Sequence, residues 1–109
     1  MVTEQLPTPE RLPGSITLET DGDLLVLCFS GEIDSAVVEG FRESRRRPAP
    51  IDAIEAGTVT FISSAGLALM LLWWEAARAA GRAPTLRRMS SSAERVVRQA
   101  GLNAIFVHP

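Results

Sequence analysis

The chain has 109 residues, of which 46% are apolar and 22% charged, and its formal net charge is −2. This length suffices for one domain with a single hydrophobic core, and the composition is that of a globular protein rather than a disordered one. The small negative charge argues against a nucleic-acid-binding domain, which is normally clearly basic. The single cysteine, Cys28, excludes an internal disulfide and favours a reducing compartment.

The N-terminal segment, residues 1–13, contains three prolines and few apolar residues. We expect it to be a flexible arm before one folded domain over residues 14–109. The arm lacks the basic start and the apolar stretch of a signal peptide. The longest unbroken apolar run, residues 65–74, is shorter than the roughly 20 residues that a membrane-spanning helix needs. These features predict a cytoplasmic protein that does not insert into a membrane.

The domain begins with a predicted hairpin. Ile16 and Leu18 alternate with polar residues, which is typical of a half-buried strand, and Asp21-Gly22 is a tight-turn signal. Residues 24–29 are continuously apolar, which favours a central position in the sheet for the second strand.

A helix and a strand are predicted next. Asp34 or Ser35 can cap the helix, which ends at the arginines of residues 45–47, where positive charge complements the helix dipole. Residues 51–56 form the predicted strand, and Gly57 marks its end.

The segment "TFISSAGLALMLLWWEAARAAG", residues 60–81, predicts a long apolar helix that begins with two serines. Ser63 or Ser64 can cap it. Gly66 costs about 1 kcal/mol of helix stability relative to alanine. Together with Ala65 it leaves little bulk at the helix start, so we expect a partner to approach the hydroxyls closely there. Gly66→Ala is therefore expected to stabilise the helix slightly and to weaken partner binding.

The same helix is apolar nearly all round. One apolar stripe must face the sheet, and the other packs on a neighbouring helix or meets a partner. Because Trp73 and Trp74 point about 100° apart on a helix, we expect one of them at a rim or an interface.

The last part of the chain predicts two short strands, residues 83–89 and 104–107, around a helix over residues 90–101. Ser91 and Glu94 have the spacing of a capping box at the start of this helix. Strands that alternate with helices imply mostly parallel pairing. The sequence thus predicts an α/β domain with a mixed, mostly parallel sheet of four to five strands, of which the first is antiparallel.

No group of residues indicates catalysis. A serine nucleophile needs a base within hydrogen-bond reach, and the only histidine is His108, next to the C-terminus. One cysteine and one histidine make no metal-ligand cluster, and there is no Walker-type phosphate loop. We therefore expect a protein that is not an enzyme and that carries no metal or cofactor.

Three stretches, "FSGEID", "VTFISSAGLALML" and "AGLNAIF", resemble the STAS domain of bacterial anti-sigma factor antagonists. The resemblance spans residues 14–109. It implies a STAS-type fold and a cytoplasmic binding protein that docks an anti-sigma factor serine/threonine kinase, with no direct contact to nucleic acid. It also implies that this kinase phosphorylates Ser64, two residues before the motif glycine, and thereby switches the protein off and regulates sigma-factor-dependent transcription. Weak homodimerisation stays open.

The resemblance also implies where the partner binds. The expected surface comes from the "GEID" loop and from the start of the second long helix, and comprises Glu32, Asp34, Ser35, Ser63, Ala65, Gly66 and Leu67. Many members of the family carry Asp where this chain has Ser63, so here the negative charge at the helix start is lost while a capping side chain is kept. Whether Ser63, Ser64 or neither takes the phosphate stays open. The stretch "SSAGLALML" is also similar to the small STAS subunit of bacterial lipid-trafficking ABC transporters, which is the alternative function. A third is a helper domain without phosphorylation.

Overall fold

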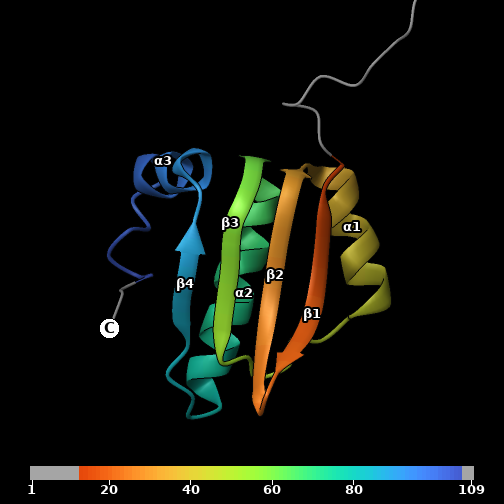
Figure 1. Ribbon diagram of the computed structural model, residues 1–109, viewed down its shortest axis with the longest axis vertical. Coiled ribbons are helices and arrows are strands. Elements are labelled where there is room, and N and C mark those ends of the chain that lie inside the picture. The colour runs from red at the N-terminus through yellow and green to blue at the C-terminus, as the bar shows by residue number, and fades with distance from the viewer. Residues whose placement is uncertain (1–12, 107–109) are drawn as a thin grey trace, which may run out of the picture.

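The computed structural model describes residues 13–106 of the chain, which form four strands and three helices (Figure 1). The elements are β1 (Ser15–Asp21), β2 (Leu24–Ile33), α1 (Ser35–Ser44), β3 (Ala53–Ile62), α2 (Ser64–Ala79), β4 (Thr85–Met89) and α3 (Ser91–Gln99). Residues 1–12 of the expected N-terminal arm lie outside the described residues.

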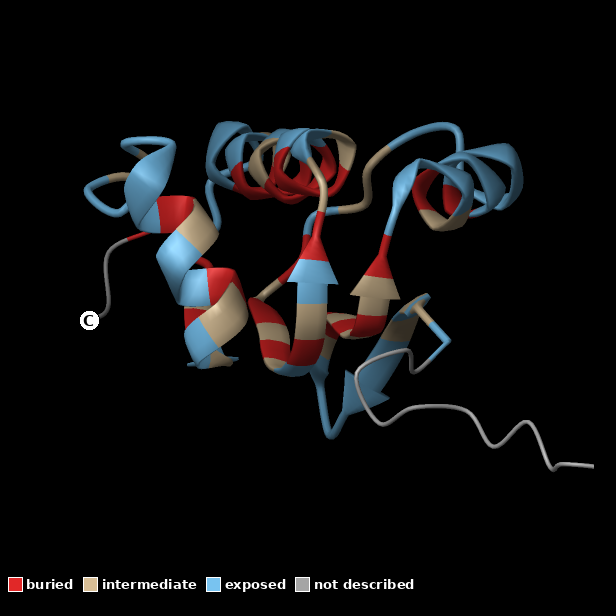
Figure 2. Ribbon diagram, turned by 90° about the horizontal axis from the view of Figure 1, so that it is seen from above, coloured by how far each residue is buried: buried red, intermediate tan, exposed pale blue. Residues whose placement is uncertain are grey.

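The strands form one mixed sheet in the order β1-β2-β3-β4. β1 pairs with β2 in antiparallel fashion, and β3 pairs in parallel with both β2 and β4. This arrangement confirms the predicted mixed sheet, its antiparallel first strand and the hairpin at Asp21-Gly22. Figure 2 shows α1 and α2 side by side along one face of the sheet. The buried side chains of the strands and helices form a single core between the two layers.

β3 is longer than predicted, because Gly57 does not end it. The pairing of β2 with β3 shifts between the Cys28 pair and the Ser30 pair, so that β3 holds one extra residue there. The amide of Gly57 donates to the Glu55 carboxylate at 3.1 Å. Glycine in a strand often marks such a bulge, and the strand resumes beyond it because β2 continues to offer backbone partners.

The strand predicted over residues 104–107 is not formed at residues 104–106, and Val107 lies outside the described residues. The amides of Ile105 and Phe106 donate back to the Leu102 carbonyl, at 2.9 and 3.2 Å, which makes a turn. Phe106 is 3% exposed and packs edge-on against Trp74, with ring centroids 5.0 Å apart. Burial of this ring therefore determines the conformation of the segment.

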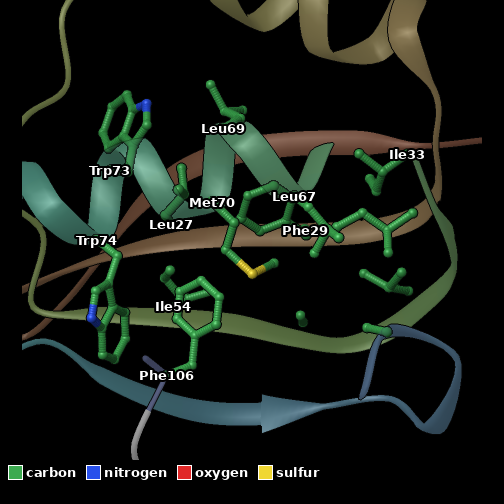
Figure 3. Close-up of a cluster of buried hydrophobic side chains, with 14 of the residues drawn as sticks. Leu27, Phe29, Ile33, Ile54, Leu67, Leu69, Met70, Trp73, Trp74 and Phe106 are labelled. Carbon is green, nitrogen blue, oxygen red and sulfur yellow. The ribbon is translucent and has the colours of Figure 1, made fainter. Parts of the chain in front are cut away.

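Both tryptophans of α2 are buried, so the expectation that one lies at a rim was wrong. Trp73 packs against Phe41 of α1 with ring centroids 5.4 Å apart, while Trp74 packs against Phe106. Figure 3 shows the two indoles pointing in different directions from the helix. Their divergence lets α2 fix both α1 and the C-terminal turn. In the described residues, no helix is both long enough and apolar enough to cross a membrane.

The cap of α3 also differs from the predicted one. Ser90, not Ser91, is the N-cap, and its hydroxyl accepts from the Ala93 amide at 3.1 Å. Glu94 lies in the first turn and pairs with Arg98 at 3.6 Å. The run of three serines offered several cap positions, and the hydrogen bond from the Ser90 amide to the Ala56 carbonyl at 2.9 Å selects this one.

Asp52 joins the beginnings of three strands at the end of the sheet opposite the starts of the helices. Its Oδ2 accepts from the Leu25 amide at 2.8 Å and its Oδ1 from the Arg82 guanidinium at 2.6 Å, while the Thr85 amide donates to its carbonyl at 3.1 Å. The Leu25 hydrogen bond and, after it, Arg82 hold the pKa of Asp52 below its ordinary value, against an opposing effect of desolvation.

We predict that Asp52→Asn lowers the melting temperature at neutral pH, because it removes the charge that Arg82 pairs with. A lowered folded-state pKa contributes stability that is present above the unfolded value, about 3.9, and is lost as the pH falls through the folded value. Thermal unfolding across a pH series should therefore show the gap to the wild type closing below about pH 4. Asp23→Asn, in the exposed hairpin turn, is the matched control and should show no gap. A gap that stays constant down to the lowest pH would contradict the assignment.

Candidate partner-binding site

One hydrogen bond links the loops that precede α1 and α2. The amide of Ser63 donates to the carbonyl of Ile33 at 2.9 Å, which extends the parallel pairing of β2 with β3 by one step past their last residues. Because the carboxyl ends of parallel strands meet at one edge of the sheet, the two helices begin side by side. The structure therefore places the "GEID" loop next to the serine pair.

Each of these helices is capped by the residue before it. The Asp34 Oδ1 accepts from the Val37 amide at 2.9 Å, and the Ser63 Oγ accepts from the Gly66 amide at 3.1 Å. The structure thus settles both open choices of cap, in favour of Asp34 over Ser35 and of Ser63 over Ser64. Ser64 is the first residue of α2, and its side chain is exposed.

Five of the predicted site residues lie together at this surface. Asp34, Ser35 and Ser64 are exposed, and Ser63 and Ala65 are half-buried. They combine a carboxylate, hydroxyls and a small apolar side chain at two adjacent helix starts. The five side chains named here are small, and four of them are polar.

The other three predicted site residues are not brought to this surface. Glu32 is half-buried and pairs with Phe61, and alternation along β2 directs it to the sheet face opposite that of its neighbour Ile33. Leu67 is 7% exposed and belongs to the core, and Gly66 is buried. The side of the first turn that carries Gly66 and Leu67 faces the sheet.

Gly66 is required by packing, which corrects the expectation that it clears space for a partner. A Cβ at this position would lie 2.7 Å from Ile62 Cγ1 and 2.9 Å from Ile33 Cγ2. Contacts this short force neighbouring side chains to move. The absent side chain lets the start of α2 approach the ends of β2 and β3.

We predict that Gly66→Ala destabilises the protein by about 1–3 kcal/mol, through overpacking against Ile33 and Ile62. Gly40→Ala is the matched control, since it makes the same change inside α1, where a Cβ would meet nothing within 4 Å. That variant should gain about 0.5–1 kcal/mol from the better helix propensity of alanine. Urea denaturation measures both, and an equal gain in the two variants would show that Gly66 has no packing role.

The structure adds two apolar positions that the sequence did not single out for this surface. Ala68 and Leu72 follow Ser64 at one and two turns along the exposed side of α2, and Leu72 is 47% exposed. Positions i, i+4 and i+8 fall on one side of a helix. The sequence could not identify this side as the exposed one, because the whole segment is apolar and no polar stripe marks the side facing solvent.

The described groups offer little for covalent chemistry. No three potential metal ligands cluster among residues 13–106. Cys28 lies between Glu19 and Glu55 on the sheet face away from α2, and burial followed by the charge of Glu19 raises the pKa of its thiol. A thiol with a raised pKa is a poor nucleophile. The helix starts, by contrast, carry the positive ends of two helix dipoles and so accommodate negative charge at Ser64.

The fold and this surface define a small α/β domain of one sheet and three helices, with two helix starts paired at the edge of the sheet. Two solved structures are similar to it. One is that of the anti-sigma factor antagonist SpoIIAA in its unphosphorylated form, with a TM-score of 0.65 and 20% identity, covering 87% of this chain and 88% of that chain. The other is that of an anti-sigma factor antagonist from Mycobacterium paratuberculosis, with a TM-score of 0.63 and 23% identity, covering 95% and 91%.

At these identities the two structures establish the shared fold. A family model described as "Mlab, STAS domain" matches residues 16–108, which is most of the sequence. The chain therefore belongs to the STAS-domain family, as the motifs predicted. The search of curated proteins found no match.

Proposed function

We propose that this protein is an anti-sigma factor antagonist that binds an anti-sigma factor serine kinase and is switched off by phosphorylation of Ser64. The observation that carries the proposal is the exposed Ser64, next in sequence to the Ser63 amide that bonds the Ile33 carbonyl before the Asp34 cap, on a fold shared with two anti-sigma factor antagonists. The function is binding: the unphosphorylated surface docks the kinase, the sigma factor is released, and transcription is switched on.

The position of Ser64 suits a switch that leaves the fold intact. Phosphorylation adds about −1.5 to −2 charges at pH 7. The start of α2 tolerates this charge, because backbone amides and the helix dipole favour an anion there. A partner surface that fits a small neutral hydroxyl must instead desolvate the phosphate, so that the complex is weakened while the free protein stays folded.

Ser64 is favoured over Ser63 as the acceptor for a geometric reason. The Ser63 Oγ accepts a hydrogen bond from the Gly66 amide, and its side chain is half-buried. A phosphate on that oxygen would replace the cap of α2. Ser64 lies one residue further on, where its side chain is exposed and makes no such bond to the first turn.

We predict that an anti-sigma factor kinase from the same genome, incubated with ATP, phosphorylates the protein at Ser64 and that Ser64→Ala abolishes incorporation. Ser91→Ala is the matched control, because Ser91 is likewise the first residue of a helix that begins after a serine cap. Mass spectrometry of the intact protein and its peptides locates the phosphate. Phosphate found only on Ser63 would overturn the assignment.

We also predict that Ser64→Glu folds normally and binds the kinase at least about a hundredfold more weakly than the wild type. A negative charge at a helix start stabilises the helix by about 0.3–1 kcal/mol, so thermal unfolding should not suffer. Ser91→Glu puts the same charge at the start of α3 and should bind like the wild type. Calorimetry measures both affinities, and full binding by Ser64→Glu would refute the switch.

The alternative function is the STAS subunit of a lipid-trafficking ABC transporter. Two observations favour it: the description of the matching family model, and the exposed Leu72, which extends the surface beyond Ser64 with apolar area. Stable assembly needs more apolar contact than a transient switch does. The first turn of α2 presents only the small side chains of Ser64 and Ala65 at the surface, which suits the switch better. Copurification of an ATPase subunit in place of a kinase would favour the transporter.

A further inference from the structure

A groove lies at the end of α2 that is remote from Ser64. It has a volume of about 590 Å³, which is in the range of small-molecule sites. Its apolar walls include Trp74, Pro84 and Ile105, and Arg78 and Arg82 supply its charged groups. None of these residues belongs to the proposed kinase-binding surface.

The indole of Trp74 lines this groove, and its N–H is covered by neighbouring atoms and has no acceptor within residues 13–106. The Trp74 side chain is 3% exposed, and its Nε1 is buried without a hydrogen-bond partner in the described part of the chain. In Figure 3 the nitrogen lies on the side of the ring that points away from Phe106. A buried N–H without an acceptor is unfavourable and rare in native proteins. An acceptor that reaches this N–H from the groove, after a small shift of the lining side chains, would remove that cost.

Three backbone carbonyls near the end of α2 are already engaged. The amides of residues 80–82 donate to the carbonyls of Ala76, Ala77 and Arg78, at distances of 2.9 to 3.1 Å. The polar side chains that line the groove are those of Trp74, Arg78 and Arg82, and all three can only donate hydrogen bonds. The side chains of the groove therefore favour a ligand that accepts hydrogen bonds.

The charge of the groove is positive. Arg82 is paired with Asp52 at 2.6 Å, whereas Arg78 is exposed and forms no ion pair within residues 13–106. Arg78 follows Trp74 by four residues, which puts both on the same side of α2. The Arg78 guanidinium has no ion-pair partner within residues 13–106, so its charge is complementary to that of a single carboxylate. The apolar side chains of the groove are complementary to a hydrocarbon body.

We propose that this groove binds an organic carboxylate with an apolar body. Its carboxylate accepts from the Arg78 guanidinium, and it reaches the covered Trp74 Nε1 after a small shift of the side chains that line the groove; its hydrocarbon part lies along Pro84 and Ile105. The site is independent of Ser64, so that ligand binding here and kinase binding at the other end of α2 can be tested separately.

The test is a titration of the full chain with hexanoate, followed by proton NMR of the indole N–H signals. The chain has two tryptophans, and Trp73→Phe assigns the signal of each. We expect hexanoate to shift the Trp74 signal saturably and to leave that of Trp73 nearly unchanged. 1-Hexanol, which lacks the charge, and inorganic phosphate, which lacks the apolar body, should each bind more weakly.

Arg78→Gln should weaken hexanoate binding about tenfold, because it removes the charged donor. Arg46→Gln, which makes the same change at an exposed arginine outside the groove, is the matched control and should bind like the wild type. The proposal is overturned if hexanoate leaves the Trp74 signal unmoved, if Arg78→Gln binds as tightly as the wild type, or if hexanol or phosphate binds as tightly as hexanoate.

Discussion

The parallel pairing of β2 with β3, continued by the hydrogen bond from the Ser63 amide to the Ile33 carbonyl, is the constraint on which the site depends. It puts the ends of two strands in register, and the helices that follow must then start side by side. Asp34 and Ser63 cap those helices with their own side chains. Asp34 and Ser63 therefore come directly after the last residues of the strands and cap the helices that follow. They also lie at the edge of the surface that carries Ser64.

The first turn of α2 divides sharply into a packed side and an exposed side. Gly66 lies against Ile33 and Ile62, where an added methyl group would force side chains to move, and Leu67 belongs to the core. Ser64 lies on the other side, in solvent. Because interiors are close-packed and surfaces are not, a charge added at Ser64 meets water rather than core. This division allows a modification to change binding without changing the fold.

The far end of α2 is organised by aromatic packing. Trp73 contacts Phe41 of α1, and Trp74 contacts Phe106 of the C-terminal turn. These contacts bury two indoles where the apolar character of the helix alone suggested an interface. Within residues 13–106 the Trp74 N–H has no acceptor, and Trp74 lines one groove together with Arg78. The start of α2 thus carries the Ser64 hydroxyl, whereas the residues near its end, Trp74 and Arg78, carry N–H groups that can only donate hydrogen bonds.

The sequence by itself determined the elements, the hairpin, the mixed sheet and the stretches that form the site, since periodicity, caps and turn residues act over a few positions. It could not show that β3 runs on past Gly57, because only pairing with β2 compensates a bulge. It could not divide the apolar α2 into buried and exposed sides, or show that Gly66 is a packing residue. Nor could it show that Phe106 turns inward instead of forming a strand. Tertiary structure decided these points, because each depends on a neighbour that is remote in sequence and close in space.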